Sequence, residues 1–252
     1  MLSQQSKYER FKALHERTFV TPNPWDAGSA RLLASLGFEA LATTSAGYAF
    51  SKGKLDSFAS LERNEIFDNA AEIVGATTLP VSADLGDGFG DAPEVCAETI
   101  RLAAKIGLVG GSIEDATGDP TAPIYGLSQA VERVQAAAEA ARDLPFLLTA
   151  RAENFLWDKP DLEAIRTVCA SVDKPVNVVM GLKGSAFSVG ELSEAGVRRT
   201  SVGGSFARAA LGALMRAAEE VKATGTFTYA EDALPGSYIT KVMALTKQDE
   251  RQ

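Results

Sequence analysis

The sequence predicts an α/β fold, in particular a (β/α) TIM-type barrel formed by a single domain over residues 1–252. Two observations favour this architecture. Short apolar runs alternate with helix-length amphipathic segments along the whole chain, which is the pattern of a parallel sheet. Polar or glycine-rich residues follow several different runs, as expected where many strand ends build one active site. The 46% hydrophobic content suffices for one large core.

Seven apolar runs are the candidate strands, and several are continuously apolar, as in parallel strands buried on both faces. They are residues 18–20, 39–44, 79–83, 108–113, 145–150, 175–180 and 198–203. The helical stretches include residues 26–36, 60–75, 92–106, 128–142, 161–171 and 205–223. An open doubly wound sheet remains an alternative. However, the first run leads into TPNPWDAGSA, which lacks the GxGxxG turn typical of that fold.

Composition excludes several classes of function. The formal charge of −8 argues against nucleic-acid binding, and no apolar run is long enough to span a bilayer. The polar residues 1–14 lack the apolar core of a signal peptide, so we expect a cytoplasmic protein with Cys96 and Cys169 reduced. The only histidine is His15, which excludes a multi-histidine zinc site. Chemistry should therefore depend on carboxylates, arginine, lysine, backbone amides and a hard metal.

Carboxylates follow two consecutive apolar runs, as Asp84 and Asp87 after the third and as Glu114 and Asp115 after the fourth. Brought together at neighbouring strand ends, they would repel one another unless a cation lay between them. Ligation by oxygen alone favours Mg²⁺ or Mn²⁺ over zinc. Helix capping is the alternative interpretation. It is weaker for Asp84 and Glu114, which directly end strong apolar runs.

A cation and two groups of small residues complete the candidate site. Arg151 ends the run 145–150 and suits bidentate binding of a carboxylate, unless it only pairs with Glu153 or another acid. The small residues Ser45, Ala46 and Gly47 form a turn whose amides could also receive a carboxylate. SVGGS at 201–205 resembles phosphate-binding barrel loops, although this signal is weak alone.

These segments together resemble the isocitrate lyase/phosphoenolpyruvate mutase superfamily, in its 2-methylisocitrate lyase-like or carboxyphosphonoenolpyruvate phosphonomutase-like branch. SADLGDGFGD (82–91) resembles the family's Asp-x-Asp-Thr-Gly-Tyr-Gly segment, GSIEDA (111–116) its Ile-Glu-Asp strand end, and TARAEN (149–154) its Ala-Arg-Thr-Asp segment. TPNPWDAGSARLL, TTSAG, KPVNVV and SVGGSFARAA match other units in order. The resemblance covers about residues 11–223.

The resemblance implies a (β/α)₈ barrel that is often a tetramer of helix-swapped dimers, with Mg²⁺ at its mouth and an enolate stabilised on the metal. By position, Asp84 and Glu114 match metal-site acids, and Asp87 is a possible further ligand. Arg151 matches the substrate-carboxylate arginine, and Ser45, Ala46 and Gly47 match the substrate-holding turn. Asn177, in the run 175–180, is a further candidate substrate-binding residue.

Three departures from the family pattern are visible. Gly86 stands where the family has a second acid, and Asp87 comes one residue late. The loop 115–127 has no Cys, His or Lys, so the lyase thiol is absent. Between Arg151 and Lys174 only one helix-length segment fits, so the chain is one βα unit short. We expect the gap to be closed by seven-strand pairing, by a loop or by a partner subunit.

The sequence therefore predicts a Mg²⁺-dependent enzyme, with Mn²⁺ as a possible substitute, acting on a small 2-oxo acid or related carboxylate. Decarboxylation or hydrolysis is favoured over the full lyase reaction, and P–C or P–O chemistry stays open. Tyr48 and Tyr125 are candidate proton donors. One alternative is a phosphate-recognising barrel aldolase or isomerase, although neither Lys174 nor Lys183 has a clear Schiff-base setting. Another is a non-catalytic 2-oxo-acid-binding protein. We expect a homodimer or homotetramer, with residues 227–252 packing on a partner subunit.

Overall fold

The computed structural model describes residues 2–57, 60–153, 161–182 and 186–244. Each of the seven predicted strands is present: β1 (Phe19–Thr21), β2 (Leu41–Ala42), β3 (Val81–Asp84), β4 (Gly110–Glu114), β5 (Leu147–Arg151), β6 (Asn177–Val179) and β7 (Arg199–Ser201). The helices are α1 (Gln4–Leu14), α2 (Ala27–Ser35), α3 (Ser45–Ser51), α4 (Arg63–Ala76), α5 (Pro93–Lys105), α6 (Leu127–Ala141), α7 (Leu162–Ser171), α8 (Val189–Glu194), α9 (Ser205–Thr224) and α10 (Gly236–Ala244), with a 3₁₀ turn, η2 (Thr228–Glu231).

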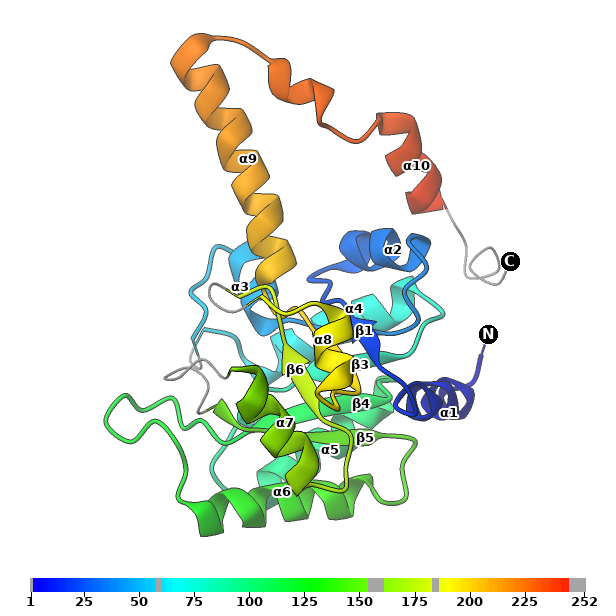
Figure 1. Cartoon of the computed structure of the whole chain (residues 1–252), viewed down its shortest axis with the longest axis vertical. Coiled ribbons are helices and arrows are strands. Elements are labelled where there is room, and N and C mark those ends of the chain that lie inside the picture. The colour runs from blue at the N-terminus through cyan, green and yellow to red at the C-terminus, as the bar shows by residue number, and fades with distance from the viewer. Residues whose placement is uncertain (1, 58–59, 154–160, 183–185, 245–252) are drawn as a thin grey trace.

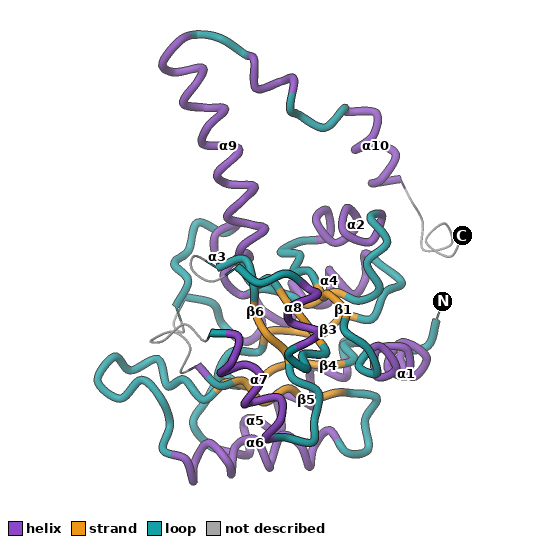
Figure 2. Tube along the Cα trace, viewed as in Figure 1, coloured by secondary structure: helices purple, strands orange, loops and turns teal. Residues whose placement is uncertain are grey.

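All paired strands are parallel, and they form two sheets in the orders β1-β7-β6 and β2-β3-β4-β5. Figure 2 shows the strands in orange within a surround of purple helices. The predicted parallel α/β architecture is therefore confirmed. Among the described residues the strands form two separate ladders rather than one continuous one, so the predicted closed barrel is not seen, and the two sheets meet at two seams.

The seam between β1 and β2 is joined at the carboxyl ends of both strands. The amide of Ala42 donates to the Pro22 carbonyl over 3.0 Å. One residue further along, the side-chain nitrogen of Asn23 donates to the Thr43 carbonyl over 2.8 Å. These bonds keep the ends of the two sheets side by side at the face where we expect the active site.

The seam between β5 and β6 is joined by a buried arginine. Arg199 on β7 donates through Nη2 to Thr149 Oγ1 on β5 over 2.8 Å, and through Nε to Asn177 Oδ1 on β6 over 3.0 Å. Burial lowers the pKa of Arg199 to about 10, so the group stays charged at neutral pH. Among the described residues, only the helix α7 lies between β5 and β6 in the chain.

The core explains which end of the strands is open. The largest apolar cluster lies between β2–β4 and the helices α4 and α5, and includes Leu41, Ile73, Val81 and Ile100. At the opposite end, α1 contributes Phe11 and Leu14 to a cluster with residues that begin or precede strands, among them Phe19, Ala40 and Val109. Because α1 covers the amino ends of the strands, the carboxyl ends remain available for chemistry.

The long helix α9 leaves the body of the molecule as an arm (Figure 1). Its exposed large apolar side chains are Phe206, Leu211, Leu214 and Met215. The left-handed Gly225 (φ 68°) ends α9, and α10 then returns to α2 of the same chain. There Arg31 bonds the Met243 carbonyl and Val242 is buried. Among the described residues, no helix has both the length and the apolar character needed to cross a membrane.

Candidate active site

The predicted charged residues meet at the carboxyl ends of three adjacent strands. Asp84 ends β3, Glu114 ends β4 and Arg151 ends β5. Parallel pairing places Glu114 directly beside Arg151 in register. Arg151 Nη1 lies 2.9 Å from Glu114 Oε2 and 3.2 Å from Asp84 Oδ1. Strand order therefore brings together three residues that lie far apart in the chain.

A third carboxylate, Glu153, also contacts Arg151, through the Nε atom. The side chains of Glu114 and Glu153 are each 7% exposed, whereas that of Arg151 is 37% exposed. The guanidinium thus lies between two buried acids and the partly exposed Asp84. The ion pair with Glu153, which the sequence left as an alternative role for Arg151, is present together with the contacts to the site acids.

The electrostatics of this group show an excess of negative charge. Burial raises the pKa of Glu114 to about 8; Arg151 opposes this effect, while Asp84 and Glu153 add to it. Burial alone would lower the pKa of Arg151, but Asp84, Glu114 and Glu153 raise it above its usual value. One arginine does not neutralise three neighbouring acids, so the site favours an additional cation.

The surroundings of Asp84 fix its orientation. Its Oδ2 accepts from Ser45 Oγ over 2.8 Å, and its backbone amide donates to Thr43 Oγ1 over 3.0 Å. Ser45 belongs to the first turn of α3, which Thr44 caps by accepting from the Gly47 amide. The predicted turn of Ser45, Ala46 and Gly47 is thus the start of a helix that adjoins the acid site.

Asp56 is an exposed acid whose charge acts on the site and which the sequence interpretation did not include. Desolvation and then the charge of Asp84 raise its pKa, while Arg151 lowers it. Asp56 lies in the loop after α3, so its influence on the site is electrostatic. No apolar run precedes it, so periodicity gave no signal for it.

Two other predicted site residues have different surroundings. Asp87 Oδ1 accepts from the Phe89 amide over 2.9 Å, so this carboxylate caps the turn after β3, although its charge still acts on Glu114. Asn177 begins β6, and its hydrogen bonds go to Ser201 Oγ and Arg199 within the β5–β6 seam. The structure therefore does not bring Asn177 into contact with the Arg151 cluster.

The loop 115–127 forms a short hairpin beside the site. Ala116 and Ile124 pair as an antiparallel bridge, and the Tyr125 amide donates to the Asp115 carbonyl over 2.8 Å. The Tyr125 hydroxyl bonds Asp91 Oδ1 over 2.6 Å, and its ring lies 4.2 Å from the Arg133 guanidinium. Burial and the bond to Asp91 raise the pKa of Tyr125. Tyr125 is thus held in packing, which makes it a poor proton donor.

The glycine loop that resembled a phosphate site has an internal partner. The amides of Val202 and Gly203 both donate to Asn23 Oδ1, over 2.8 and 2.9 Å. Because these amides are already bonded, they argue against the alternative of a phosphate-recognising aldolase or isomerase. Lys183, one of the two lysines considered for that alternative, lies outside the described residues.

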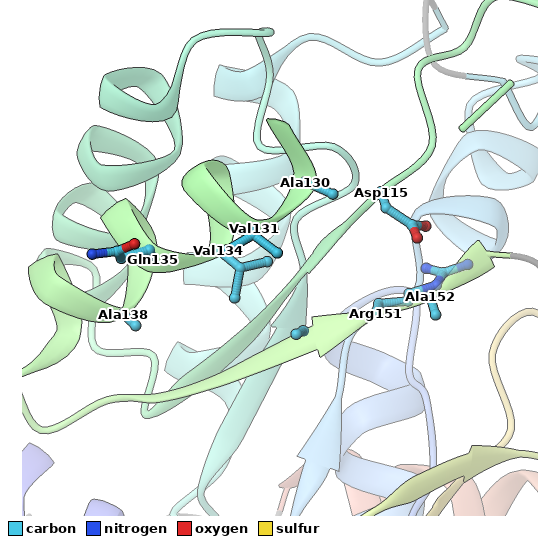
Figure 3. Close-up of a pocket in the computed structure, with 9 residues that line it drawn as sticks. Asp115, Ala130, Val131, Val134, Gln135, Ala138, Arg151 and Ala152 are labelled. Carbon is cyan, nitrogen blue, oxygen red and sulfur yellow. The ribbon is translucent and has the colours of Figure 1, made fainter. Parts of the chain in front are cut away.

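A groove of about 400 Å³ lies on the outer side of β5, against α6 (Figure 3). It is lined mainly by small apolar side chains, including Ala130, Val131, Val134 and Ala150, and its end reaches Asp115 and Arg151. In a full barrel, the helix of another βα unit would cover this side of the strand. The lining of this groove is mainly apolar, so the charged residues at the strand ends remain the better candidates for chemistry.

The donor set decides which metal could fit. Among the described residues, no three or more His, Cys, Asp or Glu side chains are grouped closely enough to enclose an ion. Mg²⁺ does not require such a cage, because it keeps several waters and uses one or two carboxylates. Asp84 and Glu114, in a site with excess negative charge, fit this mode and would hold such an ion.

Fold and site define a parallel α/β protein with a carboxylate–arginine site at its strand ends. The family described as phosphoenolpyruvate phosphomutase matches residues 11–164 and 155–222. The chain therefore belongs to the phosphoenolpyruvate mutase/isocitrate lyase superfamily, as its motifs predicted.

Curated relatives carry different activities. The chain is 30% identical to an oxaloacetate decarboxylase of Chromohalobacter salexigens over 175 residues, 67% of this chain and 60% of the relative. It is 29% identical to a 2-methylisocitrate lyase of Shewanella oneidensis over 130 residues, 49% and 44% of the two chains. The chain thus spans about half the length of the curated relatives that it matches.

Solved structures match over nearly the whole chain. A protein from Burkholderia cenocepacia J2315, provisionally described as a lyase/mutase, is 50% identical with a TM-score of 0.93, covering 98% of this chain and 99% of that one. A 2,3-dimethylmalate lyase is 22% identical with a TM-score of 0.82, covering 97% and 96%. This second similarity concerns the fold, which is that of the TIM-barrel-like superfamily structures.

Proposed function

We propose that this protein is a Mg²⁺-dependent enzyme that acts on a small 2-oxo acid or a related carboxylate, with carbon–carbon lysis or decarboxylation as its reaction. The observation that carries the proposal is the contact of Arg151 with Asp84 and Glu114 at three adjacent strand ends. A substrate that binds a metal through its carboxylate requires a guanidinium for the carboxylate and oxygen ligands for the metal, and this site offers both side by side.

Each residue has a role in this proposal. Arg151 binds the substrate carboxylate and fixes its plane, while Glu153 holds the guanidinium from the other side. Asp84 and Glu114 would hold Mg²⁺, and Ser45 orients Asp84. When bound, the cation supplies a Lewis acid that stabilises negative charge developing on a substrate oxygen. Mn²⁺ would serve the same role, because it also prefers oxygen ligands.

The choice among reactions follows from the loop 115–127. It contains no Cys, His or Lys, and Tyr125 is bonded to Asp91. A reaction that needs a strong acid from this loop is therefore disfavoured, whereas loss of CO₂ from oxaloacetate needs none at that position. The oxaloacetate decarboxylase among the relatives agrees with this order of preference.

The test is an assay of the purified protein with Mg²⁺ against oxaloacetate, 2,3-dimethylmalate, 2-methylisocitrate, isocitrate and phosphonopyruvate. We expect turnover of oxaloacetate or of a malate-type substrate, lost on addition of EDTA and in Asp84→Asn. A matched control is Asp143→Asn, which lies in the loop after α6, away from the site. If oxalate binds with Mg²⁺ but no candidate turns over, the chain is a binding protein and the proposed activity is wrong.

A further inference from the structure

Asn23 is a buried residue, 5% exposed, that connects three segments at the carboxyl ends of the strands. It follows β1, its Nδ2 donates to the Thr43 carbonyl after β2, and its Oδ1 accepts from the Val202 and Gly203 amides after β7. The last two partners are about 180 residues away along the chain. No other described polar side chain joins both sheets at this end.

The chemistry of its partners fixes the orientation of the Asn23 carboxamide. A carbonyl oxygen can only accept, so the NH₂ group must face Thr43, and two amide N–H groups can only donate, so the oxygen must face Val202 and Gly203. Gly203 has the left-handed backbone (φ 52°) that lets consecutive amides converge on one acceptor. Such a pair of amides forms a small anion-binding concavity, and Asn23 fills it.

The second connection leads to the active site. Thr43, whose carbonyl Asn23 holds, accepts through its Oγ1 from the Asp84 amide over 3.0 Å. Asp84 is in turn the acid that contacts Ser45 and Arg151. Thr43 is 4% exposed, and its amide also donates to the Ser82 carbonyl over 3.0 Å, so its position depends on this bond together with the bond to Asn23. A displaced Thr43 would shift the end of β3 and with it the carboxylate.

We propose that Asn23 is a positioning residue. Its carboxamide oxygen occupies the amides of Val202 and Gly203 in the loop after β7, and its NH₂ group, through Thr43, fixes the position of Asp84. The consequence for specificity is that this loop does not receive a substrate phosphate, because its amides already have an acceptor. The effect on substrate binding rests on the proposed function, whereas the contact of Asn23 with the Val202 and Gly203 amides and its link to Asp84 do not.

Three variants separate the two connections. Asn23→Ala removes both. Asn23→Asp keeps an acceptor for Val202 and Gly203 but loses the donor to Thr43. Asn69→Ala is the matched control: Asn69 is also buried and donates to the Trp25 carbonyl in the same loop, but it does not reach the amides or Thr43.

The primary measurement is hydrogen exchange of the amides of Val202, Gly203 and Asp84, which needs no ligand. In Asn23→Ala we expect all three to exchange about tenfold faster, the change that one net hydrogen bond of about 1.4 kcal/mol represents. In Asn23→Asp only the Asp84 amide should accelerate, and in Asn69→Ala none should. Native exchange at all three positions in Asn23→Ala would overturn the proposal.

Two further measurements test specificity. In Asn23→Ala the Val202 and Gly203 amides lose their acceptor. Inorganic phosphate should therefore raise the melting temperature of this variant more than that of the wild type, and equal shifts would show that Asn23 does not block an anion site. Calorimetric titration of oxalate with Mg²⁺ should show weaker binding in both Asn23 variants than in Asn69→Ala. If the wild type itself fails to bind oxalate, the proposed function is wrong, and the exchange data still decide the role of Asn23.

Discussion

Replacing Arg151 by lysine tests the mechanism most directly, because the charge is kept while the planar fork is lost. In the structure, Nη1 contacts Asp84 and Glu114, and Nε contacts Glu153. A lysine ammonium is a single point that cannot occupy both positions. The variant should therefore keep its contact with one part of the acid group and lose the geometry that presents two N–H groups to a substrate carboxylate.

The size of the effect follows from the bonds lost. One charge-assisted hydrogen bond to a bound carboxylate is worth about 1.5–3 kcal/mol, or roughly a ten- to hundredfold loss of affinity. Because the Arg151 side chain is 37% exposed, solvent screening places the expected value in the lower half of that range. Loss of the Glu153 contact should also lower the melting temperature by a few degrees, about 2–4 °C per kcal/mol for a chain of this size.

Calorimetric titration of pyruvate or oxalate in the presence of Mg²⁺ measures the affinity, and thermal unfolding measures the stability. Arg63→Lys is the matched control, because Arg63 forms one surface ion pair with Glu98 at 3.2 Å, away from the site. We expect the control to bind like the wild type. Should Arg151→Lys bind the ligand with native affinity and only melt earlier, Arg151 would be a structural residue and the proposed carboxylate site would be wrong.

Three other predictions follow. Isocitrate and 2-methylisocitrate should turn over about 10²–10⁴-fold more slowly than by an enzyme with a loop acid, because the loop 115–127 lacks the thiol; lyase-like rates in a product assay would contradict this. The chain should self-associate at micromolar concentration through the exposed apolar residues of α9, and Leu214→Glu should weaken the assembly, with light scattering as the measurement; a monomeric wild type would refute it. Burial lowers the pKa of His15, so the folded state binds this proton less tightly than the unfolded chain. Its contribution to stability should be complete above about pH 6.5 and decrease as the pH falls through the lowered pKa. Urea unfolding of His15→Gln should show a smaller loss of stability on acidification than the wild type, and identical losses would show that His15 does not contribute.

The sequence was sufficient to predict the strands and the proximity of three candidate site residues. Asp84, Glu114 and Arg151 each follow a continuous apolar run, and the carboxyl ends of parallel strands lie on one face, so their proximity followed from topology alone. The contact of Arg151 with Glu153 was also foreseeable, as an alternative role. What the pattern could not show was that the guanidinium serves all three acids at once.

The residues that were missed lack such a local signal. Asn23 accepts from amides about 180 residues away, and no pattern in the sequence around Asn23 indicates these partners. Asp56 lies in a loop, where spacing carries little information. In the sequence, Arg199 is a charged residue at the start of a predicted strand, which does not indicate burial. In the structure it is buried and bonds to β5 and β6. The packing of the C-terminal segment 227–252 on a partner stays a prediction; within the chain, its described helix α10 contacts α2.

The bridge made by Arg199 has a consequence for how the molecule opens. A continuous ladder distributes the resistance to unfolding over many backbone hydrogen bonds. At the β5–β6 seam, the bonds found among the described residues are two side-chain bonds of Arg199. The small cluster of Ile165, Leu192, Ala195 and Val197, which serves α7, β6 and α8, is separate from the large core of β2–β4. We expect these three elements, which are held to the rest by the β6–β7 ladder and by Arg199, to form a cooperative unit of lower local stability. Partial unfolding should start there, detaching this unit while Asp84, Glu114 and Arg151 remain together on the more stable half.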